Sequence, residues 1–363
     1  MEFVKTKLPF IFVMVVMYWA ASASAFNGYY DKWKFFDGNP AQSLNATLDG
    51  TASQPYVYRQ LLPRIANGVQ SALPAQMAQA IELKLQTANG ALKAPDGRDA
   101  LQPGYALRYR IVYYLCFGAL FAALFVLRRL ALDLKLHPFA ALTAPVAFAL
   151  MLPILETRGG YFYDYPELLA FSLAMLFAVR GWAIPLILLA VPATMNKESF
   201  LFYCVSLLPI LLNKLSWMKA VATAGVAALV SGVTYMWVKS AYTGNSGGAT
   251  IFQLVDNIRF YANPVHLFTL ELSYGVAFFK GYSLVVLAWF ALLIKYGWPR
   301  APLAIRRHLC IAAIINLPLL LLLCAGGEMR NLSMVFVAIE VLMACALERL
   351  IAATPQAVPA SRP

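Results

Sequence analysis

Residues 107–127 decide the fold class and read LRYRIVYYLCFGALFAALFVL. The part after Arg110 carries no charge, and a helix needs about 20 largely apolar residues to cross the hydrocarbon core of a bilayer. The whole chain of 363 residues has the same character, with 61% hydrophobic and 13% charged residues, whereas a soluble domain has roughly 25% charged residues. This composition excludes an ordinary soluble enzyme and predicts an all-α integral membrane protein.

Apolar segments recur along the chain and predict about ten transmembrane helices. They cover residues 8–26, 107–127, 138–155, 165–179, 182–195, 200–213, 220–238, 267–294, 309–325 and 332–350. The chain thus divides into a first transmembrane helix (1–26), a periplasmic loop (27–106), a multi-span domain (107–350) and a cytoplasmic tail (351–363). Two amphipathic helices in the plane of the membrane interface are predicted in the loop, from the helical spacing of Tyr58, Leu61, Leu62, Ile65 and Val69 and of Met77, Ile81 and Leu85.

Basic residues indicate how these helices are oriented. They occupy every second connection, at Lys5, Lys7, Arg128, Arg129, Lys135, Arg180, Lys214, Lys219, Lys295, Arg300, Arg306, Arg307 and Arg349. Because short cytoplasmic loops are enriched in Lys and Arg, we expect both termini in the cytoplasm and the chain in a bacterial inner membrane. The net charge of +12 is spread singly or in pairs, which argues against nucleic acid as a partner. Residues 8–25 also resemble a cleavable signal peptide, and cleavage would leave nine helices.

Acidic residues show the opposite distribution. Of the 17 in the chain, this topology places three in the cytoplasm and two, Glu271 and Glu340, within helices, so the rest lie outside. Chemistry done by carboxylates is therefore expected at the periplasmic face. The cysteines and histidines have no metal-ligand spacing, and no glycine-rich nucleotide fingerprint occurs, so we expect no metal and no cofactor.

Three short outside turns carry charge at a depth where charge is costly. The segments on either side of Asn196-Lys197-Glu198-Ser199 can form only about 24 and 27 Å of helix, so this turn is expected at or below the outer phosphate level of a ~30 Å core. Residues 156–167 read ETRGGYFYDYPE and residues 326–331 read GGEMRN. Ionisable residues at such depth are usually functional. The alternative is that they only pair with one another.

The first loop supplies two further candidates. Asp31 follows the first apolar segment closely and should stay near the membrane surface, or it is a solvated carboxylate balanced by Lys32 and Lys34. Arg59 begins an amphipathic segment, where it could hold a phosphate or simply extend its charged end to water.

The layout resembles the GT-C superfamily of lipid-dependent glycosyltransferases, with one span, a long outer loop, and then many spans with charged outer turns. Locally, YVYRQLLP (56–63), GGYFYDYPELLAF (159–171) and NKESFLF (196–202) resemble segments of uncharacterised bacterial GT-C-like membrane proteins. The resemblance implies transfer of a sugar from a polyprenyl-phosphate donor to a glycan or lipid acceptor, with Asp31, or Asp37 as second choice, as general base. Lys32 stands where some members carry a second acid, which argues against a metal site in this loop.

The residue types fit these roles. A carboxylate that takes the proton of the attacking hydroxyl is worth about 10²–10⁴-fold, and the candidates are Asp31, Glu198 and Asp164. Cations hold the charge of the leaving phosphate, and the candidates are Lys197, Arg59, Arg158 and Arg330. Contacts to sugar and acceptor are assigned to Glu156, Glu328, Tyr161, Tyr163, Trp33 and Asp37. We expect Asp31, Lys197, Glu198 and Arg330 to meet in one wet pocket.

Other function classes stay open. A polymerase or ligase of lipid-linked glycans would use the same parts. A proton-coupled transporter or flippase is suggested by Glu340 and Glu271 within predicted helices. Transport should then be impaired most by substitution of Glu340. Against a transporter stand the lack of an internal repeat and the position of most acids outside the membrane.

Overall fold

The computed structural model describes residues 2–36, 39, 41–87, 104–248 and 252–353 of the chain. Within these ranges the protein is predominantly helical, and five helices are long and apolar enough to cross a membrane. They are α1 (Glu2–Trp33), α5 (Tyr105–Asp133), α6 (Pro138–Leu155), α11 (Trp217–Ser240) and α14 (Leu303–Leu323). The prediction of a helical, membrane-embedded protein is confirmed at this level.

Further elements fill the rest of the described chain. Those that precede α5 are η1 (Lys34–Phe36), α2 (Leu44–Leu48), η2 (Tyr56–Tyr58), α3 (Leu61–Ala72) and α4 (Ala75–Thr87). Those that follow α6 are α7 (Asp164–Arg180), α8 (Ala183–Asn196), α9 (Phe200–Ser206), α10 (Leu208–Leu211), α12 (Leu254–Ala262), η5 (Pro264–Phe268), β1 (Leu270–Ser273), β2 (Val276–Phe279), α13 (Leu284–Tyr296), η6 (Met329–Leu332) and α15 (Ser333–Ala353). The two amphipathic segments predicted in the first loop are therefore helical, as α3 and α4.

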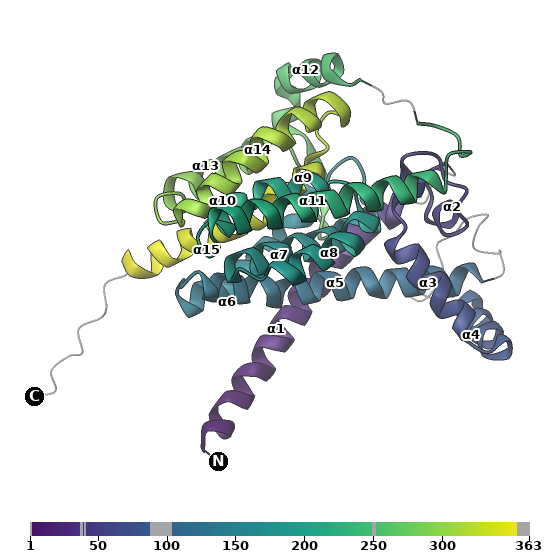
Figure 1. Ribbon diagram of the computed structural model, residues 1–363, viewed down its shortest axis with the longest axis horizontal. Helices are drawn as coiled ribbons and strands as arrows, with labels where there is room; N and C mark the ends of the chain where they lie inside the picture. Colours follow the sequence, from purple (N-terminus) through teal and green to yellow (C-terminus); the bar gives the residue numbers. More distant parts are fainter. Residues whose placement is uncertain (1, 37–38, 40, 88–103, 249–251, 354–363) are drawn as a thin grey trace, which may run out of the picture.

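The helices pack side by side in one bundle. Figure 1 shows α5, α6, α7, α8 and α11 running alongside one another, with α1 crossing them, and α1 makes its closest packing with α6. Tyr18 of α1 donates to the Leu142 carbonyl of α6 at 3.2 Å across this contact. Helix α3 packs against α5 and α8, so the first loop is attached to the bundle.

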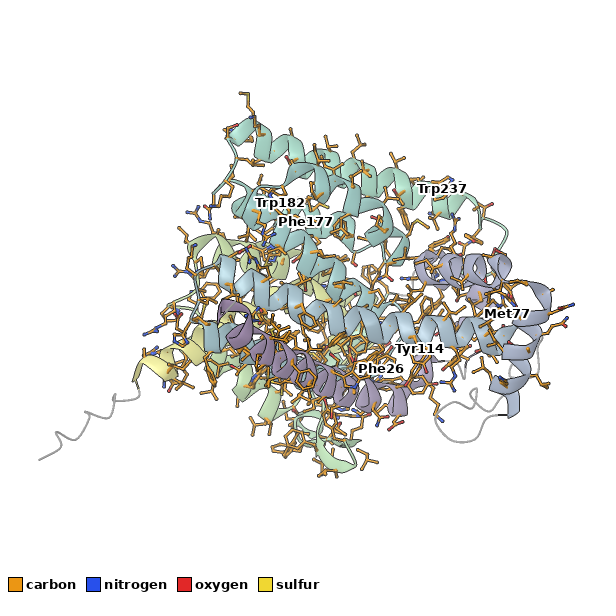
Figure 2. All side chains as sticks on the ribbon, turned by 90° about the horizontal axis from the view of Figure 1, so that it is seen from below. Phe26, Met77, Tyr114, Phe177, Trp182 and Trp237 are labelled. Atoms are coloured by element: carbon orange, nitrogen blue, oxygen red, sulfur yellow. The ribbon has the colours of Figure 1, made fainter. Side chains whose placement is uncertain are left out.

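The two ends of the bundle differ in chemistry. At one end the predicted cytoplasmic connections meet, because Arg180 pairs with Asp133 at 2.6 Å and Arg349 donates to the Lys295 carbonyl at 3.4 Å. Trp182 and Phe177 lie together at this end in Figure 2, and Met77 of α4 projects at the opposite end. The charged turns described below gather at the end that carries α3 and α4.

The predicted helix 200–213 is interrupted at Leu207, between α9 and α10. Pro209 accounts for the break, because its ring has no N–H and would clash with the carbonyl of the residue four positions earlier. The result is a kinked segment rather than one straight helix.

The predicted span 267–294 is wrong in its first half. Residues 270–279 form an antiparallel hairpin in which Leu270 pairs with Phe279 and Ser273 with Val276, and only Leu284–Tyr296 is helical. Tyr274 and Gly275 both have positive φ angles, of 55° and 78°, as a two-residue type I′ hairpin turn requires. Glu271 consequently lies on a strand and not within a transmembrane helix.

Candidate active site at the outer turns

Four stretches that are distant in sequence, which include the three turns predicted to lie outside, meet at the end of the bundle that carries α3. They are the start of α3 with η2, the turn between α6 and α7, the turn between α8 and α9, and η6 before α15. Gly160 lets the end of α1 approach the second of these, because a Cβ there would lie 2.4 Å from a ring carbon of Tyr29 and 2.6 Å from one of Trp33. The side chains of these stretches form the outer-turn cluster described below.

A deeply buried ion pair of the cluster joins α7 to the turn after α8. Lys197 Nζ donates to Glu167 Oε2 at 2.8 Å, and the two side chains are only 10% and 3% exposed. Ser333 Oγ donates to the other carboxylate oxygen of Glu167 at 2.9 Å, and Ser199 Oγ does so at 2.5 Å. Glu167 lies in the first turn of its helix, where the helix dipole stabilises a negative charge.

Arg330 forms the second part of the cluster. Its guanidinium donates to Glu328 Oε1 at 2.6 Å and to Asp164 Oδ1 at 3.2 Å. The other oxygen of Asp164 accepts from the Tyr161 backbone N–H at 2.8 Å. Asp164 therefore fixes both its own turn and the arginine of η6.

Arg59 and Glu198 form the third part, at the rim. Arg59 donates to Glu198 Oε1 at 2.7 Å and to the Pro55 carbonyl. The Arg59 side chain is 7% exposed, whereas that of Glu198 is 36% exposed. Glu198 is the most accessible carboxylate among the paired acids of the cluster.

Three tyrosine rings form a stack against which the cations pack. Tyr161 and Tyr163 lie 5.1 Å apart and nearly parallel, and Tyr56 stacks on Tyr161 at 5.8 Å. Arg330 lies 4.4 Å from the centre of the Tyr161 ring, and Arg59 lies 5.3 Å from that of Tyr163. Such cation–π contacts hold a guanidinium plane in one orientation.

Both guanidinium groups have a donor to spare. Arg59 Nε and Arg330 Nε are buried, and among the described residues neither has a hydrogen-bond partner. A buried polar group of this kind needs a water or a ligand atom to satisfy it. Since both groups are donors, the cluster is suited to bind oxygen atoms of a ligand.

A small cavity lies beneath the cluster. Its volume is about 10 Å³, which is room for one water molecule. The polar residues that line it are Glu156, Asp164, Glu167, Arg330 and Ser333. A ligand larger than a water molecule does not fit in this cavity.

Glu156, at the end of α6, is neutral near pH 7. Burial raises the pKa of its carboxyl to about 8, and the nearby negative charge of Asp164 adds to the shift. Tyr165 OH donates to Glu156 Oε2 at 3.2 Å. The cluster thus pairs three basic side chains, those of Arg59, Lys197 and Arg330, with four acidic ones, and Glu156 lies beside them with a raised pKa.

Glutamine at position 156 should remove a pH dependence of stability. The raised pKa keeps Glu156 protonated in the folded state, whereas the same carboxyl ionises in the unfolded state. The contribution of Glu156 to the free energy of unfolding is therefore complete below about pH 4.5 and is lost as the pH rises through 8. The slope in this window is about 1.4 kcal/mol per pH unit. We expect the unfolding midpoint of the wild type to fall relative to Glu156→Gln between pH 5 and 8, measured by thermal denaturation in detergent.

A control for this measurement is Asp256→Asn, since Asp256 is a 69% exposed carboxylate on α12. It should follow the wild type at every pH. Identical pH profiles for wild type and Glu156→Gln would contradict the assignment of a neutral buried carboxyl.

An apolar groove runs beside the cluster along the bundle. It has a volume of about 330 Å³ and lies between α3, α5, α7 and α8. Small residues, Gly118, Ala119, Ala170 and Ala193, open it, and Asn196 lines it next to Lys197 of the cluster. Asn196 donates to the Tyr163 carbonyl at 2.8 Å, and its own buried carbonyl oxygen has no partner among the described residues.

Most of the predicted site residues meet here. Those in or against the cluster are Arg59, Glu156, Tyr161, Tyr163, Asp164, Lys197, Glu198, Glu328 and Arg330. Trp33 reaches its edge, where Nε1 donates to the Glu156 carbonyl at 3.1 Å. Asp37 lies outside the described residues.

The expectation that Asp31 joins the cluster is wrong. Helix α1 continues to Trp33, and Lys32 and Trp33 point to α6, where they contact the Pro153 and Glu156 carbonyls. Since successive helical residues are rotated by about 100°, Asp31 points elsewhere. Its exposed carboxylate accepts from Asn27 of the same helix at 2.8 Å.

Arg158 is also directed away from the cluster. Its backbone has a φ angle of 59°, and its exposed side chain packs 5.1 Å from the ring centre of Phe260 on α12. It therefore holds the outer segment 254–268 and is not positioned to share a ligand with Arg59 and Arg330.

Sequence reasoning did not select Glu167, Tyr56, Ser199 or Ser333. Glu167 belongs to the same acidic turn as Asp164. Its spacing of three residues from Asp164 could have identified it, because this spacing places both acids in the first turn of one helix. Tyr56 likewise precedes Arg59 by three residues. The serines gave no signal of their own.

Comparisons with known proteins give no independent assignment. No family model, no curated protein and no solved structure matches this chain. The function has to be argued from the cluster and the groove.

Proposed function

We propose that this protein is a membrane glycosyltransferase that takes a sugar from a polyprenyl-phosphate donor and passes it to a glycan or lipid acceptor. The observation that carries the proposal is the junction at Asn196 and Lys197, where an apolar groove meets a cluster of cations, carboxylates and tyrosines. A lipid-linked sugar has the same division, with a hydrocarbon chain, a phosphate and a ring. A soluble donor would have no use for the groove.

The proposed topology keeps ten crossings in a bacterial inner membrane. Helix α13 (Leu284–Tyr296) takes the place of the segment 267–294 as the eighth crossing. Both termini lie in the cytoplasm, supported by the basic residues that meet at the end of the bundle opposite the cluster. The cluster then opens to the periplasm at the depth of the outer phosphates.

The donor phosphate binds at Arg59, with Lys197 and Arg330 nearby. Arg59 Nε needs an acceptor, and its other partner, Glu198, is exposed enough to move away. A guanidinium binds phosphate oxygens in pairs. Phosphate binding therefore releases Glu198 from Arg59 and makes its carboxylate available to the acceptor.

Glu198 then acts as the general base. The acceptor oxygen bonds to the anomeric carbon while the bond from that carbon to the phosphate oxygen breaks. The hydroxyl proton passes to Glu198, and the lipid phosphate leaves with the bonding electrons, its charge held by the cations. Tyr56, the half-buried ring at the end of the tyrosine stack, offers a flat surface for a sugar ring.

Filling the groove tests the lipid-linked donor. A Cβ on Gly118 of α5 would meet no atom within 4 Å, and the same holds for Gly225 of α11, but only Gly118 lines the groove. Phenylalanine at Gly118 should displace the chain while Gly225→Phe leaves it in place. If two methylenes of the donor's lipid chain are no longer buried, at about 0.8 kcal/mol each, the KM for the donor should rise about tenfold.

The assay follows consumption of radiolabelled polyprenyl-phosphate sugars by the purified protein in vesicles, with a bacterial membrane extract as acceptor. We expect consumption by the wild type and by Gly225→Phe, and the tenfold higher KM for Gly118→Phe. Equal activity of both variants would refute the groove as the donor site. No consumption of any donor by the wild type would refute the proposed function.

A transporter or flippase is the second candidate, favoured by one observation. Glu340 in α15 is completely buried, and neither of its carboxyl oxygens has a hydrogen-bond partner among the described residues. This alternative would be selected if the protein moves a lipid-linked glycan across the membrane without consuming the donor. The movement should need a proton gradient and should be lost in Glu340→Gln.

A further inference from the structure

The β1–β2 hairpin presents apolar side chains on both of its faces. Leu270 and Leu272 are 55% and 65% exposed on one face, and Val276 and Phe278 are 63% and 40% exposed on the other. Large apolar side chains seldom gather in this way on a surface that faces water. The hairpin needs an apolar environment that the rest of the described chain does not supply.

The hairpin packs beside two candidate membrane spans, below the end of α6. Tyr274, in its turn, donates to the Leu150 carbonyl at 2.9 Å, and Leu150 precedes the end of α6 by five residues. At 1.5 Å per residue this is about 8 Å below the outer end of that helix. The Tyr274 ring also lies against Gly28 of α1, where a Cβ would be only 3.0 Å away. Both helices are candidate membrane spans.

The charges of the hairpin are turned inward. Between Phe268 and Gly281 the sequence contains only Glu271 and Lys280 as ionisable acid and base. Glu271 accepts from Lys32 of α1 at 2.9 Å and lies 3.9 Å from Lys280. Since these charges are paired against α1, they do not oppose insertion into an apolar medium.

The backbone sets how deep the hairpin can go. A two-stranded sheet leaves N–H and C=O groups unpaired along its outer edges, and such groups are not tolerated in the centre of a bilayer. At the boundary between headgroups and acyl chains, about 5–10 Å deep, water still reaches them. The depth of the Tyr274 contact falls within this range.

We propose that the hairpin, residues 270–279, is a membrane-inserted anchor that docks into the lipid leaflet on the side of the outer-turn cluster. Its partner is the hydrocarbon of that leaflet, next to α1 and α6. This inference does not depend on the proposed glycosyl transfer. It also accounts for the strong apolar signal of a segment that does not cross the membrane.

The anchor is tied directly to the cluster. Lys32 joins Glu271 to α1, and the next residue, Trp33, donates to the Glu156 carbonyl. After the hairpin, the Gly281 backbone N–H donates to the Ile154 carbonyl at 2.9 Å. Insertion of the hairpin therefore fixes the depth of the turn that carries Tyr161 and Asp164.

Nitroxide labels test the insertion in the full-length chain. In a background without native cysteines, single cysteines at Leu272, Leu229 and Arg259 are labelled, and the protein is placed in phospholipid vesicles. Leu229 is 66% exposed on α11 and reports the lipid interior, while Arg259 has a 78% exposed side chain on α12 and reports water. Collision rates with oxygen, which enters lipid, and with a water-soluble nickel chelate are measured by power saturation.

If the hairpin is inserted, the oxygen-to-nickel collision ratio of the label at Leu272 should be several-fold higher than that of the label at Arg259. It should be lower than the ratio of the label at Leu229, which lies deeper. A ratio at Leu272 equal to that at Arg259 means that the hairpin faces water, and it overturns the proposal. A label shielded from both reagents means that another protein surface covers the hairpin, and it overturns the proposal as well. Leu270→Cys on the same face repeats the measurement if Leu272→Cys does not fold.

Discussion

Glutamine in place of Glu198 is expected to lower the rate of sugar transfer by about 10²–10⁴-fold, the range for loss of a positioned general base. Glutamine keeps the size of the side chain and an acceptor oxygen for the 2.7 Å bond from Arg59. The fold and the binding of the donor should therefore stay intact. The loss should appear in kcat, with KM little changed, because the proton is transferred only in the reaction step.

The chain offers a matched control in Asp49→Asn. Asp49 pairs with Arg108 at 2.7 Å and its side chain is 38% exposed, compared with 2.7 Å and 36% for Glu198. It lies outside the cluster, so the control should transfer sugar at the wild-type rate. Loss of transfer in Asp31→Asn with full activity in Glu198→Gln would overturn the choice of base.

The fold could be predicted where local chemistry decides it. Helix α6 covers the predicted residues 138–155, because Pro138 at its first position and His137 as the N-cap give a clear start. The hairpin was missed because an apolar run alone does not separate a buried helix from a strand pair. The signal was Tyr274-Gly275, which favours a tight turn, together with Gly281 and the N-cap Ser283.

The site could be predicted as a set of turns but not as a set of contacts. Charge in turns too short to leave the membrane pointed to Lys197, Glu198 and Arg330. Which carboxylate each cation meets depends on how α7, α8 and α15 pack, and the pairing of Lys197 with Glu167 across 30 residues is set by that packing. The exclusion of Asp31 similarly depends on the rotation of α1, which stays helical beyond its apolar segment.

The unpaired groups of the cluster support the proposal that its charges do more than stabilise the fold. A closed set of ion pairs would satisfy every donor and acceptor, yet the donors Arg59 Nε and Arg330 Nε and the acceptor Asn196 Oδ1 are buried without partners among the described residues. Replacing buried ion pairs by apolar residues is often neutral or stabilising. In the proposed site, phosphate and sugar groups of the donor would satisfy these buried atoms.

Arg330→Met is expected to destabilise the protein by about 3–5 kcal/mol, the usual cost of removing one partner of a buried ion pair. Methionine fills a similar volume but leaves Asp164 and Glu328 without their cation. The side chains of these two acids are 7% and 13% exposed, so water cannot replace the arginine fully. The unfolding midpoint in detergent, by heat or denaturant, measures the loss.

A second variant separates loss of charge from loss of packing. Arg330→Met combined with Asp164→Asn and Glu328→Gln removes the unpaired charges and should recover most of the stability, whereas it should not recover sugar transfer. Arg259→Met removes an exposed pair with Asp256, whose atoms are 3.6 Å apart, and should change stability by at most about 1 kcal/mol. If Arg330→Met is no more destabilising than Arg259→Met, the acids of the turn are already solvated, and the outer-turn cluster is not the buried, preorganised site on which the proposed transfer depends.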